Sequence, residues 1–369
     1  MPNRFRSILL LLAAPVAAIV FATVLSAIIL LVAGSNPITA FGDMLEHGTK
    51  TGTMVDMLNR ATPLYLSGVA AAIGFKMGLF NIGVEGQYQM GAFFAAAAGG
   101  AIVLPEGIHL IFIILVAMAV GSLWAGLAGF LKVTSGINEV ISTIMLNAIA
   151  LGGVLAWLTV KWREGALTTS SGTKLIEESG HMFDLNWFME IFTGEIPSNK
   201  ELSGVLLVAI LVGVGYHLLV NRSRFGYDLR ASGINPLAAR AGGVPPKRMI
   251  MIAMLLSGAV AGLVGMVDIL SRNHRYDQNF TPGLGFAGLA VALLGRNNPA
   301  GIAVGALLFA FLDASSSILQ ITGSASREIV IIMQGVIMLA AVIAYEFVNR
   351  IRERDEIRQA SLAVSGADT

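Results

Sequence analysis

Cysteine is absent from this chain of 369 residues, and charged residues are scarce. Without cysteine the protein can form no disulfide bond and no thiolate metal site. Asp, Glu, Lys and Arg make up 13% of the chain, whereas soluble domains carry roughly 25%. The net charge is only +1, which argues against electrostatic binding of nucleic acid.

Patterns typical of catalysis are also missing. The five histidines are scattered, and no two stand at the helical spacing of a metal site. The fragment Gly172-Thr173-Lys174 lacks the remainder of a phosphate-binding loop, so the chain has no recognisable route to ATP hydrolysis. Neither a serine with a base nor paired carboxylates on one helix can be identified. The sequence therefore predicts no catalytic residue, no metal and no cofactor.

Apolar residues dominate instead, at 55% of the chain with a mean hydropathy of +0.75. A membrane-spanning helix needs about 20 predominantly apolar residues. We expect an all-α polytopic membrane protein with about ten segments: 8–33, 63–78, 87–104, 110–131, 140–160, 202–220, 249–270, 284–296, 300–319 and 327–348. The first is about twice as long as the apolar region of a signal peptide, and we expect it to be retained.

Two of these segments, 63–78 and 284–296, are short and contain glycine. Short, interrupted segments at corresponding places in two halves are a pointer to an internal repeat and a transport pathway. Whether each of the two crosses the membrane or re-enters it stays open.

Positive charge predicts the orientation. Loop 221–248 carries six Lys or Arg residues against Asp228 alone, whereas loop 161–201 carries four basic and seven acidic residues. Because basic loops stay in the cytoplasm, loop 221–248 and both termini are expected inside, and loop 161–201 outside. Ten crossings satisfy this arrangement.

A transmembrane domain is thus expected over residues 1–348, followed by a partly disordered cytoplasmic tail at 349–369. Loops 34–62 and 161–201 are expected outside, in water. The second could hold a short helix or hairpin near 184–193.

The stretch "GLFNIGVEGQYQMGAFF" at 78–94 places polar residues between two apolar segments. One interpretation is a pathway element, because non-helical backbone at membrane depth must be buried in protein or face a cavity. Gly83 and Gly86 would permit such backbone, and a carboxylate such as Glu85 usually faces the bundle interior. The alternative is a cytoplasmic turn with Glu85 in water, and the residues favour neither.

"NEVISTIMLN" at 138–147 places Glu139, Thr143 and Asn147 four residues apart, on one helix face. A polar face turns away from lipid, toward other helices or a pore. Hydrogen bonding between helices and lining of a pathway are both compatible with this pattern.

Loop 221–248 contains the signals of a short, well-capped helix. Asn235 is a good N-cap, Pro236 suits the first helical position, and Gly242-Gly243 end the helix. A merely solvated basic loop would not need a capped helix bearing small apolar residues, so we interpret it as a docking element. Its candidate contact residues are Asn235, Pro236, Leu237, Ala238, Ala239, Arg240 and Gly242.

Four stretches together resemble the membrane permeases of bacterial ABC importers for ribose-like sugars, nucleosides and branched-chain amino acids: "PLYLSGVAAAIGFKMGLFNIGVEGQYQMGAF", "GINEVISTIMLNAIA", "RSRFGYDLRASGINPLAARAGGV" and "GLAVALLGRNNPAG". The similarity runs from about residue 60 to 345, and the form with Asn81-Ile82-Gly83 and Glu85-Gly86-Gln87 is closest to the nucleoside branch.

This resemblance implies a non-catalytic subunit in the bacterial inner membrane. It would import nucleosides, purine nucleosides above all, delivered by a lipoprotein receptor. The implied partners are a separate ATPase docked on residues 235–242, a second and different permease, and the lipid bilayer. The resemblance also makes 80–87 part of the translocation pathway, giving the candidate set Asn81, Gly83, Glu85, Gly86, Gln87, Glu139, Thr143 and Asn147.

Three rival functions remain. The same role could serve a simple sugar such as ribose. A self-sufficient channel or facilitator would not need the helix at 235–242. An intramembrane enzyme would need one of the constellations that the chain lacks.

Overall fold

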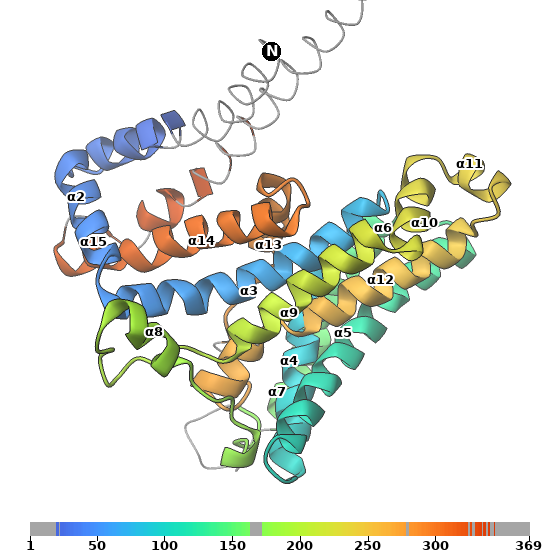
Figure 1. Cartoon of the computed structure of the whole chain (residues 1–369), viewed down its shortest axis with the longest axis horizontal. Coiled ribbons are helices and arrows are strands. Elements are labelled where there is room, and N and C mark those ends of the chain that lie inside the picture. The colour runs from blue at the N-terminus through green and yellow to red at the C-terminus, as the bar shows by residue number, and fades with distance from the viewer. Residues whose placement is uncertain are drawn as a thin grey trace, which may run out of the picture. The chain divides into compact units, whose positions relative to one another are not determined.

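A computed structural model describes residues 20, 21, 23–162, 172–277, 280–323, 325, 326, 329–333, 335, 336, 339 and 343. Across this part of the chain the structure is helical (Figure 1), and its β-structure is limited to two isolated bridges, Gly172 with Asp277 and Asp184 with Ser203. The all-α prediction is therefore confirmed. The tail at 349–369 and most of segment 327–348 lie outside the described residues.

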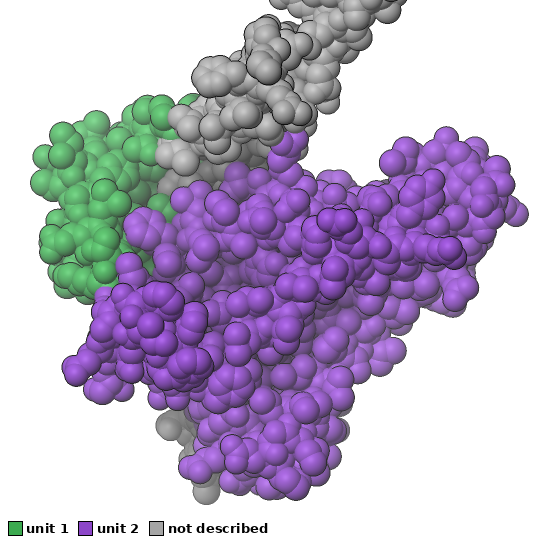
Figure 2. Space-filling view, viewed as in Figure 1, with its two compact units in different colours: residues 1–50, 312–369 green, residues 51–311 purple. Residues whose placement is uncertain are grey.

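The chain divides into two compact units, coloured separately in Figure 2: residues 1–50 with 312–369, and residues 51–311. In the first unit, α2 (Pro37–Gly48) and α15 (Ser317–Ile321) share an apolar core with Leu30, Val330 and Met333. Asn36 caps α2 by accepting a hydrogen bond from Ile38 N.

The second unit holds most of the helices and all the candidate site residues. Its elements are α3 (Thr51–Lys76), α4 (Val84–Ala101), α5 (Ile108–Ser135), α6 (Glu139–Ile149), the π-helix Ala150–Leu155, α7 (Ala156–Lys161), the 3₁₀ turn Glu178–Gly180, α8 (Asn186–Thr193), α9 (Val205–Tyr216), the π-helix His217–Asn221, α10 (Arg224–Ile234), α11 (Pro236–Ala241), α12 (Pro246–Gly262), the π-helix Asp268–Arg272, α13 (Leu284–Leu294) and the greater part of α14 (Pro299–Ser315).

Among the described residues, three helices are long and apolar enough to cross a membrane by themselves: Ile108–Ser135, Glu139–Lys161 and Pro299–Ile321. The number rises to five if each of two bent pairs counts as one span. These pairs are Thr23–Val32 with Pro37–Gly48, bent by 118°, and Val205–Asn221 with Arg224–Ile234, bent by 68°. The described residues thus form a multi-pass membrane protein. The ten crossings that the sequence predicted exceed the three to five candidate spans in this part of the chain.

Helix α3 differs most from the expectation. The sequence predicted a loop over 34–62 and a short segment over 63–78, whereas one helix of 26 residues runs from Thr51 to Lys76 and α2 fills most of the remaining loop. Hydropathy missed the first half of α3 because its polar side chains are satisfied by distant partners. Asn59 Nδ2, for example, donates to Glu201 O (2.7 Å), and Asn59 Oδ1 accepts from Ser203 N (3.0 Å).

The two ends of α3 contact different loops. At its N-terminal end, Asp56 pairs with Lys200, and Thr51 lies beside the end of α8. The helix α8 confirms the short helix expected near 184–193. At the other end, the backbone of Gly233 in α10 packs against Met77 and Lys76. The acidic loop and the basic loop therefore lie at opposite ends of a helix about 39 Å long.

Segment 284–296 is confirmed as short. Helix α13 has only 11 residues, Leu284–Leu294, and ends at Gly295. Its length of about 16 Å is half of what a bilayer crossing requires. Since α3 is long, 63–78 and 284–296 do not form the matched pair of short segments that the sequence suggested.

Candidate functional site

Residues 77–83 leave α3 and return alongside it. The turn begins at Gly78, which has a φ of +73° and packs closely on the carbonyl oxygen of Gly233. Asn81 then lies beside Gly74 of α3, since a Cβ at Gly74 would lie 3.5 Å from Asn81 Cβ. Asn81 Nδ2 donates to Ser257 Oγ (2.8 Å), and Ser257 Oγ donates to Ala70 O (2.6 Å), which links the returning chain to α12 and α3.

The returning backbone is stabilised by two amide side chains. Asn81 Nδ2 donates to Gln87 Oε1 (3.0 Å), and Gln87 Nε2 donates to Asn81 Oδ1 (2.8 Å). Gly83 N also donates to Asn81 Oδ1 (3.1 Å). Both amides are fully buried. The backbone at 79–81 is non-helical, and Leu79 and Asn81 are buried whereas Phe80 is 48% exposed.

Glu85 lies in the first turn of α4 and faces a different neighbour. Its Oε1 accepts hydrogen bonds from Gly283 N (2.7 Å), Tyr88 Oη (3.1 Å) and Gln89 Nε2 (3.0 Å), and its Oε2 accepts one from Gly285 N (2.9 Å). The side chain therefore caps the N-terminus of α13, where backbone N–H groups lack helical partners and the helix dipole favours negative charge. Glu85 is 1% exposed, so a carboxylate in water at an ordinary turn is excluded.

Helix α6 packs its polar face against the start of α4. Asn147 Nδ2 donates to Ile82 O (2.9 Å), and Asn147 Oδ1 accepts from Gly86 N (2.9 Å). Thr143 donates to Glu139 O (2.7 Å) in its own helix, and its Cβ lies close to Gly83. Hydrogen bonding between helices is therefore confirmed for Asn147.

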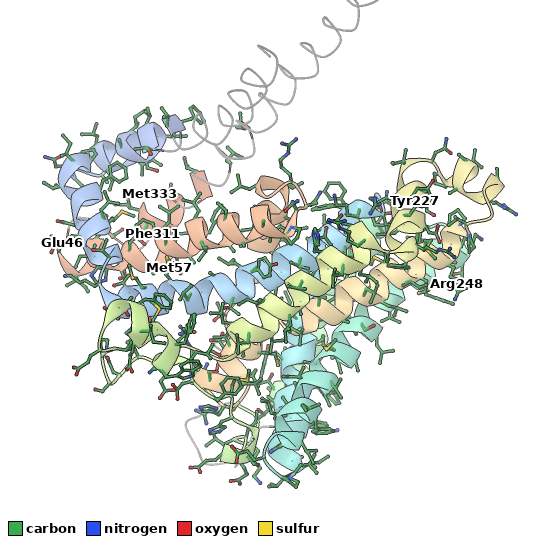
Figure 3. The ribbon with its side chains drawn as sticks, in the orientation of Figure 1. Glu46, Met57, Tyr227, Arg248, Phe311 and Met333 are labelled. Atoms are coloured by element: carbon green, nitrogen blue, oxygen red, sulfur yellow. The ribbon has the colours of Figure 1, made fainter. Side chains whose placement is uncertain are left out.

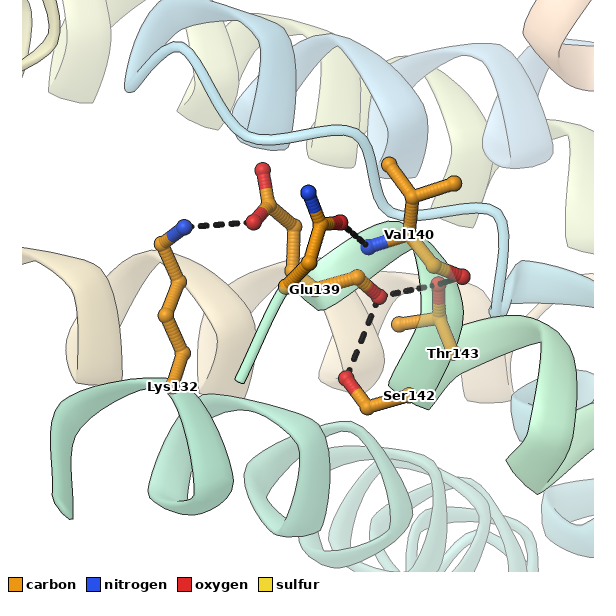
Figure 4. Close-up of polar contacts among 6 residues, drawn as sticks. Lys132, Glu139, Val140, Ser142 and Thr143 are labelled. Atoms are coloured by element: carbon orange, nitrogen blue, oxygen red, sulfur yellow. Dashed lines mark hydrogen bonds and ion pairs between the residues drawn. The ribbon is translucent and has the colours of Figure 1, made fainter. Parts of the chain in front are cut away.

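Glu139 lies at the edge of this group, where its carboxylate accepts a hydrogen bond from the backbone of Phe80. Its carboxylate pairs with Lys132 at the end of α5 (Figure 4), and its carbonyl accepts from Ser142 Oγ (3.2 Å) and from Thr143. Asn138 caps α6 by accepting from Val140 N (2.8 Å).

Gly83 and Gly86 are required for a reason other than the expected one. Gly83 has an ordinary φ of −70°, and Gly86 lies inside α4, so neither needs a glycine backbone conformation. A Cβ at Gly83 would lie 2.6 Å from Gln87 Nε2, and one at Gly86 would lie 2.9 Å from Asn147 Oδ1. The two glycines leave space for the amides, and the prediction of unusual backbone at these positions was wrong.

All eight predicted pathway residues therefore form one buried cluster in or against the stretch 80–87: five belong to it, Thr143 and Asn147 pack on it, and Glu139 touches it at Phe80. Sequence reasoning missed Ser257 and the two α13 amides, at Gly283 and Gly285, because they lie far from 80–87 along the chain. Tyr88 and Gln89 could have been found, since they follow Glu85 by three and four residues on one helix face.

Gln89 extends the cluster toward loop 172–182. Tyr276 Oη donates to Gln89 Oε1 (3.2 Å), while Thr173 N donates to Tyr276 O (2.9 Å). Burial, together with the nearby Asp277 and Glu85 carboxylates, raises the pKa of the Tyr276 phenol above its ordinary value of 10. The phenol therefore stays protonated and remains a donor.

The predicted docking helix is confirmed as an element. Helix α11 spans Pro236–Ala241, and Asn235 Oδ1 accepts hydrogen bonds from Leu237 N (3.1 Å) and Ala238 N (3.0 Å). The helix ends at Gly242, and Gly243 has a φ of +86°.

Only part of the predicted contact set on α11 faces outward. Ala239 is 7% exposed and faces the protein, whereas Leu237 is 81% exposed. Ile234 and Tyr227 on α10 are also exposed. Figure 3 shows Tyr227 at the same end of the second unit as Arg248, at the start of α12.

Comparison with known proteins adds the family. Residues 53–342 match the model of the branched-chain amino acid transport system permease component. The nucleoside ABC transporter permease protein NupB of Lactococcus lactis is 31% identical, covering 93% of each chain. The guanosine ABC transporter permease protein NupP of Bacillus subtilis is 32% identical over 90% of this chain and 93% of its own. The glucose ABC transporter permease protein TsgB13 of Haloferax volcanii is 29% identical over 92% and 88%. No solved structure matches.

Proposed function

The chain belongs to the family of branched-chain amino acid transport permease components, and from this membership we propose that it forms the translocation pathway of an ABC importer for nucleosides. It is a non-catalytic subunit, and ATP is hydrolysed on a separate chain. The substrate assignment rests on the similarity, over at least 90% of this chain, to permeases named for nucleosides and for guanosine. The similarity to the guanosine permease supports purine nucleosides as the substrates of this chain. The glucose permease supports a simple sugar as the second candidate.

We propose ten crossings with both termini in the cytoplasm of a bacterial cell, in its inner membrane. The contacts of α3 support this orientation. The acidic loop packs at one end of that helix and the basic loop at the other, and a helix of about 39 Å exceeds the hydrocarbon thickness of about 30 Å.

The ATPase would dock on α10 and α11. Three exposed apolar side chains lie on these two helices, within the basic loop 221–248: Tyr227 and Ile234 on α10, and Leu237 on α11. Exposed apolar groups rimmed by polar residues are typical of protein contact sites. The Asn235 cap holds α11 in place without a partner.

The buried cluster would hold helices and backbone in place around the pathway and would not bind substrate itself. Glu85 fixes the first turn of a half-length helix, α13, inside the protein, and interrupted helices of this kind surround substrate sites in other transporters. Asn81, Gln87 and Asn147 fix the returning backbone beside it. We propose that these residues shape the pathway wall, which a second and different permease would complete, with a lipoprotein receptor delivering substrate from outside.

Substrate competition tests this proposal. Cells expressing the complete importer should take up labelled guanosine. Excess unlabelled inosine should compete, uridine should compete less, and glucose or ribose should not compete. Absence of guanosine uptake by cells that do take up labelled glucose or ribose would reject the nucleoside assignment and favour the sugar alternative.

A further inference from the structure

An apolar groove lies between α3, α9 and α14. Its volume is about 420 Å³, and its lining includes Leu206 and Gly213 on α9, His217 at the start of the following π-helix, Tyr65 on α3, and Ala303 and Leu307 on α14. Small side chains create the space. At Gly213 an added Cβ would lie 1.9 Å from the Tyr65 hydroxyl, so the glycine lets the tyrosine ring form part of the floor.

The groove follows α9 and the first residue of the π-helix after it. Its lining there runs from Leu206 to His217, which is about 16 Å of helix and close to half the hydrocarbon thickness of a bilayer. The groove therefore has the depth of one leaflet, which is the depth that one lipid hydrocarbon chain occupies.

Its two ends differ in chemistry. The end at Leu58 and Leu206 is apolar, whereas the other end is formed by His217 and the start of α14. His217 is followed by Arg222 and Arg224, both exposed. The neighbouring Tyr216 donates from its hydroxyl to Asn297 O (2.8 Å), which fixes the turn before α14 beside this end. In the orientation proposed above, the basic end faces the cytoplasmic leaflet, where anionic lipids concentrate.

We propose that this groove binds one acyl chain of an anionic phospholipid from the cytoplasmic leaflet, with the phosphate headgroup at Arg222 and Arg224. Ile210 and Val214 line the groove and are also exposed on the outer surface. The groove is therefore open on that side, and an acyl chain can enter it laterally from the bilayer. The lipid would fill the space between α9 and α14 that the protein itself leaves open.

Lipid retention by the full-length protein tests this inference. The protein is purified in detergent, mixed with equal amounts of phosphatidylglycerol and phosphatidylcholine bearing the same chains, and examined by native mass spectrometry. We expect one retained phosphatidylglycerol. Ala303→Phe fills the groove and should abolish retention. Val304→Phe should leave it unchanged, because Val304 is 68% exposed and outside the lining. Arg222→Gln with Arg224→Gln should lower phosphatidylglycerol occupancy on the order of tenfold.

Equal retention by the parent and by Ala303→Phe would overturn the proposal. Equal retention of the two lipids by the parent would overturn it as well. Because lipid binding is measured without transport, its failure would leave the proposed import function unaffected.

Discussion

Glu85 is the residue on which the polar contacts around α13 converge. Its two oxygens accept four hydrogen bonds, two of them from backbone N–H groups at the start of that helix. Hydrogen bonds to a carboxylate are stronger than those between neutral groups. Because the side chain is buried, water cannot replace these bonds when it is removed.

Replacing Glu85 should therefore destabilise the protein in proportion to the donors left unpaired. Glu85→Ala leaves the amides of Gly283 and Gly285 without an acceptor, at a cost of about 1–3 kcal/mol for each buried group. Glu85→Gln keeps one acceptor oxygen and should cost less. The thermal unfolding midpoints of the detergent-solubilised proteins should fall in the order parent, Glu85→Gln, Glu85→Ala.

Glu46→Ala is the matched control, because Glu46 is exposed and its contact with Lys50 spans 4.0 Å. Such a pair contributes about 0–1 kcal/mol, so the midpoint should hardly move. If Glu85→Ala unfolds at the same temperature as Glu46→Ala, the capping role of Glu85 is wrong.

At the scale of elements, α5 and α12 touch through their backbones. An added Cβ at Gly258 would lie 2.3 Å from Gly121 O, and one at Gly262 would lie 2.1 Å from Ala117 O. Small residues four apart allow such contact between membrane helices. Loss of this contact would separate the helix that carries Ser257 from α5.

Gly258→Val should force α5 and α12 apart and cost about 1–3 kcal/mol or more, the range typical of overpacking. Gly215→Val on α9 is the comparison, because nothing lies within 4 Å of a Cβ there. The yield of monodisperse protein and the unfolding midpoint should drop for Gly258→Val only. Similar values for the two variants would show that the close contact is not needed.

A separate prediction concerns the docking of the ATPase on α11. Leu237→Glu places a charge on its exposed apolar side chain and should strongly reduce the amount of ATPase that co-purifies with the permease, because the charge would be desolvated at the contact. Ala239→Glu would be a poor probe, since Ala239 is buried against the chain itself.

Ile191→Glu on α8 provides the control, as Ile191 is 68% exposed at the other end of α3. The ATPase should be recovered with this variant as with the parent. Equal recovery with Leu237→Glu would remove α11 from the docking surface.

At the scale of the whole molecule, what the sequence predicted well was local. The bounds of α11 follow from Asn235, Pro236 and Gly242, whose effects act within one or two turns. The inward face of α6 follows from the four-residue spacing of Thr143 and Asn147. The all-α class follows from the long apolar runs.

What the sequence could not predict depends on distant contacts. The first half of α3 looks like a polar loop because Asn59 finds its partners at Glu201 and Ser203, more than 140 residues away. The role of Glu85 was invisible for the same reason, since its partners on α13 lie about 200 residues further along the chain. No local pattern records such pairings.

Reconstitution decides whether this chain works as a permease subunit. Proteoliposomes are prepared with the complete complex, with a complex whose ATPase cannot hydrolyse ATP, and with this chain alone, and each is given labelled guanosine and the receptor. We predict ATP-dependent uptake by the complete complex and none by the other two preparations. Guanosine uptake by this chain alone, independent of ATP, would contradict the account and identify a self-sufficient facilitator.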